Sequence, residues 1–172
     1  LINRRNVPAN YDLTFSYSYL DQVNRIFGTN APRSSLEAWE SDSHLIDFAY
    51  SGFENHTVRA FAYLLDFENA PANSSNTFGL ELVGTRDLGS SNKLRYVLTG
   101  ALQEEGGANP VDYREYYLRG ELGLTNDIGN IGVGTEIMTS DGAGGRFLLP
   151  LGTNHKFNGF ADAYLTTPVG GL

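Results

Sequence analysis

The chain has 172 residues, of which 41% are hydrophobic and 12% aromatic. This is enough apolar material for one folded domain and excludes a disordered chain. A net charge of −8 argues against nucleic acid as a partner, and no run approaches the roughly 18 apolar residues of a membrane-spanning helix.

Segments of about ten residues that alternate apolar with polar or small side chains follow one another along the chain. Successive side chains of a strand point to opposite faces, so each segment predicts a strand with one apolar and one polar face. In chain order these segments are residues 12–19, 46–51, 77–82, 93–103, 115–122 and 130–137. Residues 58–67 and 156–165 are also expected to be strands, although apolar groups occupy both of their faces.

Residues 93–103 illustrate the alternation. One face, suited to lipid, would carry Leu94, Tyr96, Leu98 and Leu102, and the other, suited to water, would carry Lys93, Arg95, Thr99 and Gln103. Aromatic side chains are favoured at the depth of lipid headgroups. The candidates for such a girdle are Tyr11, Tyr17, Tyr19, Phe48, Tyr50, Tyr96, Tyr116 and Phe157.

The connections between these segments alternate in length. The longer ones are residues 22–43, 68–76, 104–112 and 139–155, and the short ones are residues 51–56, 87–92 and 125–129. Bacterial outer-membrane barrels have short periplasmic turns and long external loops. The pattern therefore predicts an all-β, antiparallel, up-and-down transmembrane β-barrel of the bacterial outer membrane. Residues 1–172 would form a single barrel domain, or a fragment of one, with about eight strands.

Four stretches also resemble a known family. They are YSYLDQVNRIFG (17–28), ESDSHLIDFAYSG (40–52), AFAYLLDFENAPANSSNTFGLEL (60–82) and TNHKFNGFADAYLTTPVGGL (153–172). Together they resemble proteobacterial outer-membrane proteins of the alginate-export, porin-like type. The resemblance implies a channel with considerably more than eight strands, so that this chain would be part of a larger barrel.

The polar faces of the predicted strands supply the candidate pore-lining residues. These are Arg59, Glu81, Lys93, Arg95, Glu115, Arg119, Glu121, Glu136, Lys156 and Asp162, and Asp47 would share their face. An exporter of a polyanion is expected to line its pore with basic groups. Because both signs occur here, we expect ion pairs across the wall, and we expect the channel to pass small hydrophilic solutes, with sugar acids or an anionic polysaccharide as further possibilities.

The first long connection contains Trp39, expected as a packing anchor or, alternatively, as a sugar-stacking residue. Residues 34–39 could form a helical turn there. The two longest connections, residues 22–43 and 139–155, are candidates to fold inward and narrow the lumen.

Two alternatives remain open at this stage. One is a small closed outer-membrane barrel with a binding or anchoring role, whose interior would be filled by side chains. The other is a soluble ligand-binding β-barrel. No spacing typical of a nucleophile, a phosphate loop or a metal site occurs, so we expect no enzyme activity, no cofactor and no metal. The expected partners are the lipid bilayer and the solute, and the oligomeric state is left open.

Overall fold

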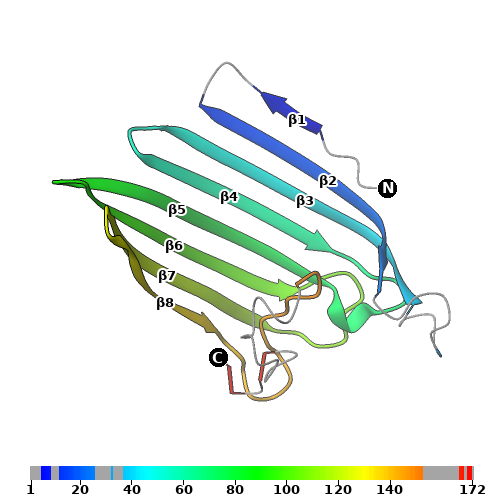
Figure 1. The fold of residues 1–172 in the computed structure, drawn as a ribbon. Coiled ribbons are helices and arrows are strands. Elements are labelled where there is room, and N and C mark those ends of the chain that lie inside the picture. Colours follow the sequence, from blue (N-terminus) through cyan, green and yellow to red (C-terminus); the bar gives the residue numbers. More distant parts are fainter. Residues whose placement is uncertain are drawn as a thin grey trace.

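The computed structural model describes residues 5–8, 12–25, 32, 37–152, 167–168 and 170–171. These residues form one eight-stranded sheet in which the strands follow chain order (Figure 1). The strands are β1 (Arg5–Pro8), β2 (Leu13–Asn24), β3 (Ala38–Phe53), β4 (His56–Leu65), β5 (Ser75–Gly89), β6 (Asn92–Glu105), β7 (Arg114–Asn126) and β8 (Gly129–Met138). One short 3₁₀ turn, η2 (Pro71–Asn73), precedes β5. In the described part of the chain, no helix is long and apolar enough to span a membrane.

Each strand pairs antiparallel with its neighbours in the chain, which confirms the predicted all-β, up-and-down topology. Residues 54–55, 90–91 and 127–128 are the short turns at one end of the sheet, and the longer connections lie at the other end. The sheet is open, however, because β1 and β8 are its two edges and do not pair with each other. The described residues therefore do not form the closed eight-stranded barrel that was one alternative. The predicted strand at residues 156–165 lies outside the described residues.

Several strands are longer than the alternation predicted. Strand β3 begins at Ala38, inside the expected first loop, and its first residues pair with the end of β2, as Trp39 does with Val23. Ala38 and Trp39 therefore belong to a strand and not to a helical turn. Trp39 is only 6% exposed and packs against the ring of Phe67 at 4.8 Å between centroids. This is the packing role expected for Trp39. Strand β1, at the other edge of β2, was not anticipated.

The ladder registers divide the side chains of β2 to β8 between two faces, because residues directly opposite in an antiparallel pair lie on the same side of the sheet. We call one the polar face, and a row across it runs Ser16, Asp47, Phe61, Gly79, Ala101, Tyr117 and Met138. We call the other the apolar face, and a row across it runs Phe15, Phe48, Ala60, Leu80, Gly100, Leu118 and Ile137. The facing predicted from the alternation is confirmed in these strands.

Most buried side chains lie on the polar face, near the end of the sheet with the longer connections; Val97, in the other half of β6, is an exception. One cluster joins Trp39, Leu65 and Phe67, and a second joins Ala101, Met138 and Phe147. The apolar face has no such cover among the described residues. Its exposed large side chains are Leu13, Phe48, Tyr50, Val58, Phe78, Leu80, Leu98, Tyr116, Leu118, Leu122, Leu124, Ile131, Val133 and Ile137.

Candidate functional site

A row of charged and polar side chains crosses the middle of the polar face. The ladder registers place Arg59 of β4 opposite Glu81 of β5, and Glu81 opposite Thr99 of β6. The row continues from Thr99 to Arg119 of β7 and from there to Glu136 of β8. Every second residue of a strand faces the same side, so the period-two pattern of five consecutive strands brings these groups into one line.

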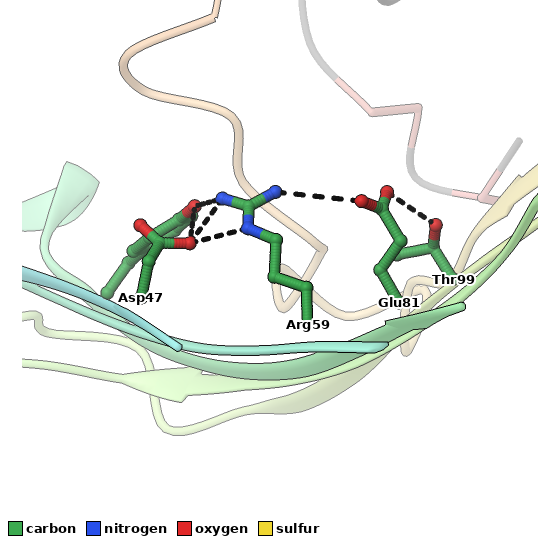
Figure 2. Close-up of polar contacts among 5 residues, drawn as sticks. Asp47, Arg59, Glu81 and Thr99 are labelled. Carbon is green, nitrogen blue, oxygen red and sulfur yellow. Dashed lines mark hydrogen bonds and ion pairs between the residues drawn. The ribbon is translucent and has the colours of Figure 1, made fainter. Parts of the chain in front are cut away.

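Arg59 is the centre of the first group of contacts in this row. Its Nε donates a hydrogen bond to Asp47 Oδ1 at 2.6 Å, and its Nη2 forms an ion pair with the same carboxylate. Nη2 also donates to the Tyr63 hydroxyl at 2.6 Å, and Nη1 lies 3.8 Å from Glu81 Oε1. Thr99 Oγ1 donates to the other oxygen of Glu81 at 3.2 Å. Figure 2 shows these side chains projecting from the same side of the sheet, with one guanidinium between two carboxylates.

Arg119 is the centre of the second group. Its Nε and Nη2 both donate to Glu121 Oε1, at 3.0 and 2.5 Å. The other oxygen of Glu121 lies 3.6 Å from Arg95 Nη1. Both groups are partly open to solvent, where ion pairs add little to stability. Their main effect is therefore to fix the charged groups in position along the polar face.

The connection after β8 covers part of this row. Residues 147–152, which we call the strap, turn back over the end of β6 (Figure 1). Phe147 is 4% exposed and packs against Ala101, Met138 and the ring of Tyr117, whose centroid is 5.5 Å away. A pocket of about 470 Å³ lies between the strap and the polar face. Its floor includes Arg59, Phe61, Tyr63, Glu81, Thr99, Tyr117 and Arg119.

The predicted pore-lining residues that the structure describes all lie on the polar face, but only some come together. Arg59 and Glu81 are one contact pair, and Arg95, Arg119 and Glu121 form another group. Three described residues, Lys93, Glu115 and Glu136, fall outside these groups. Lys93 lies near a short turn and pairs with Asp87 at 3.8 Å, whereas Glu115 is buried and accepts a hydrogen bond from Thr139. Glu136 accepts from the Tyr117 hydroxyl. Lys156 and Asp162 lie outside the described residues, as do Tyr11 and Phe157 of the expected girdle.

Three residues of the site were not among the predicted ones. Tyr63 and Tyr117 contact the charged groups directly, and Gln103 holds the strap. The alternation already placed Gln103 and Tyr117 on the polar side of their strands. This position was the only signal in the sequence that could have marked them as site residues. That signal does not show which part of the face a distant loop covers.

The chemistry available to the site is that of fixed, paired charges beside aromatic rings. Within the described ranges, no group of three or more His, Cys, Asp or Glu side chains could hold a metal ion. Comparisons with family models, with curated proteins and with solved structures find no match for this chain. Fixed, paired charges of this kind can bind and orient small polar solutes of complementary charge.

Proposed function

We propose that the chain forms part of the wall of a porin-like channel in a bacterial outer membrane, with no enzymatic activity. The apolar face would contact lipid, and the polar face would line an aqueous lumen. Small hydrophilic solutes would diffuse passively through that lumen, selected by its width and its charges.

The observation that carries the proposal is the uninterrupted apolar face. Monomeric soluble proteins rarely expose apolar patches of more than a few hundred Å². Here exposed Leu, Ile, Val, Phe and Tyr side chains extend across β2 to β8, and the opposite face carries the row of charged and polar side chains described above. Each of these seven strands has ten or more residues, from ten in β4 and β8 to 16 in β3. A transmembrane strand needs roughly 9–11.

The open sheet supports a larger barrel. In hydrocarbon every backbone N–H and C=O must have a partner, so a sheet with free edges cannot span a bilayer by itself. Strands β1 and β8 each have one unpaired edge among the described residues. Further strands would complete these ladders and enclose a lumen wide enough for water.

The charges of the polar face favour small solutes over a polyanion. Arg59, Arg95 and Arg119 each lie beside a carboxylate, and Lys93 lies beside Asp87. A continuous basic track would be needed to attract a polymer of negative charge. The paired charges give no such track, so we propose passive diffusion of small solutes, with alginate or another polyuronate as the less supported substrate.

The test is single-channel conductance of the full-length protein in a planar bilayer, with ion selectivity recorded. We expect stable open channels. Glu81→Gln should move the selectivity towards anions and Arg59→Gln towards cations, because each removes one fixed charge from the same point of the lumen wall. Ile128→Gln, at the tip of a short turn, is the matched control and should leave the selectivity unchanged.

Two results would contradict the proposal. One is the absence of conductance although the protein is shown to insert in the bilayer. The other is conductance that neither Glu81→Gln nor Arg59→Gln alters, because the polar face would then not line the conducting path.

A further inference from the structure

Between β8 and residue 152, the chain forms a closed loop at residues 140–146, which we call the tip, and then the strap. In the tip, Asp141 Oδ1 accepts hydrogen bonds from the backbone N–H groups of Ala143 and Gly144, at 2.7 and 3.0 Å. Ser140 and Arg146 form an isolated antiparallel bridge that closes the tip. The strap then leaves this closed loop and crosses the polar face. It is therefore a separate segment that must be held by the sheet below it.

A segment that crosses a sheet cannot join its ladder, so its backbone needs other partners. Gln103 supplies them at Leu148. Its Oε1 accepts from the Leu148 N–H at 2.5 Å, and its Nε2 donates to the Leu148 C=O at 3.0 Å. The side-chain amide thus pairs with the strap as a neighbouring strand would.

Gln103 is itself held rigidly. It is 2% exposed, its Nε2 also donates to Thr77 Oγ1 at 2.9 Å, and its Oε1 also accepts from the Tyr113 hydroxyl at 3.2 Å. Both amide hydrogens and both acceptor positions are in use, which is all that a Gln side chain offers. Burial raises the pKa of Tyr113, so its hydroxyl stays protonated as a donor at neutral pH. Among the other residue types only Asn carries the same side-chain amide, on a side chain that is one methylene shorter.

The two ends of the connection have anchors of their own. Thr139 donates a hydrogen bond to the buried carboxylate of Glu115, and Thr167 Oγ1 donates to the Phe147 C=O at 2.5 Å. Gln103 acts between these points, where the strap forms the roof of the pocket over Arg59, Glu81 and Thr99. The loss of Gln103 would therefore free Leu148 and the strap residues that follow it, and leave Phe147 attached.

We propose that Gln103 is the positioning residue that fixes the strap over the row of charged residues. It thereby determines how much open space remains above that row. If the sheet lines a channel, as proposed above, the strap is the constriction of that channel, and Gln103 keeps the strap in the position that narrows the lumen. The functional half of this inference rests on the proposed function. The structural half does not depend on the proposed function: it states only that the two hydrogen bonds between Gln103 and Leu148, which we call the latch, hold the strap in place.

The first experiment measures access to the floor of the pocket. The chain has no cysteine, so Thr99→Cys, in a full-length background without other thiols, introduces one thiol below the strap. A charged methanethiosulfonate reagent should label it about tenfold faster when Gln103→Leu is added, because losing the two hydrogen bonds to Leu148 costs the closed arrangement about 1.4 kcal/mol or more. Ser90→Cys, at a short turn far from the strap, should label at the same rate in both backgrounds.

A second variant protects the test against misfolding of Gln103→Leu. Leu148→Pro removes the strap's N–H donor and restricts the backbone at Leu148 and Phe147, at a position outside the strands of the sheet. It should accelerate labelling in the same direction, with the β-sheet circular dichroism of the parent retained. Unchanged labelling in both variants, with the sheet intact, would overturn the proposal.

Conductance separates the two proposals. In a planar bilayer Gln103→Leu should give a larger and noisier unitary conductance than the parent protein. Faster labelling without any channel would leave the latch standing and reject the proposed channel. Normal channels whose conductance and labelling are both insensitive to Gln103→Leu and Leu148→Pro would reject the latch and leave the channel standing.

Discussion

At the scale of single residues, an aromatic ring lies over a glycine on each face of the sheet. Phe61 of β4 covers Gly79, its direct partner on β5, and a Cβ added at Gly79 would overlap the ring. Tyr96 covers Gly84 in the same way on the other face. The ring fills the space of the missing side chain, so the two residues pack as one unit.

Gly79→Ala should destabilise the sheet by about 1–3 kcal/mol, because the new methyl group must displace a packed ring. Gly100→Ala is the matched control on the next strand. There the nearest atom to an added Cβ is Leu118 Cδ2 at 3.7 Å, an ordinary contact. Denaturant unfolding in lipid vesicles measures both. An equal, small effect of the two changes would mean that Phe61 moves aside freely.

At the scale of elements, each strand from β2 to β8 has two faces with different roles. Leu98 of β6 lies near the middle of the apolar face and is 55% exposed. One residue further on, Thr99 lies on the opposite face and donates a hydrogen bond to Glu81. A shift of one residue in the register of β6 would exchange these surroundings for the whole strand.

Leu98→Arg should cost about 2–4 kcal/mol in a bilayer if Leu98 faces lipid at mid-depth. Ile128→Arg, in a short turn where the parent side chain is 97% exposed, should cost about 0–1 kcal/mol, the range expected near the membrane interface. Urea titration of the vesicle-embedded protein gives both values. Equal costs would show that Leu98 does not face the interior of a bilayer.

The strands and the strap also show which parts of the fold could be predicted from the sequence. The facing of Leu98 and Thr99 follows from a local rule of period two, which needs no knowledge of the rest of the fold. The extension of β3 back to Ala38 does not follow, because Glu40 and Ser41 break the alternation and are paired only through contacts with β2 and Phe67. The strap over Gln103 was unpredictable for the same reason: its hydrogen bonds join residues 45 positions apart, and no local pattern records them.

At the scale of the whole molecule, the open sheet is the feature that decides what the chain can be. Along the outer side of β8, alternate backbone N–H and C=O groups have no ladder partner in the described residues. Edge strands of this length invite further pairing. In a completed barrel those groups would be hydrogen-bonded to an additional strand.

Hydrogen exchange on β8 (Gly129–Met138) tests this expectation. In the full-length protein in vesicles, the outward amides of β8 should exchange as slowly as the inward ones that pair with β7, because both sets are then hydrogen-bonded. Amides of β6, which have partners on both sides, provide the internal reference. Rapid exchange of every second amide of β8 would mean that this edge stays free in the membrane.

The neighbour-to-neighbour pairing of all eight strands also bears on how such a wall arises. Three of its hairpins close through only two residues each, at 54–55, 90–91 and 127–128, so forming each one loses little chain entropy. Contacts between strands adjacent in sequence give a low contact order, and folding can start at any hairpin and spread in both directions. The same arrangement lets a gene gain or lose one hairpin without changing the order of the remaining strands, so the width of such a sheet can change in evolution by two strands at a time.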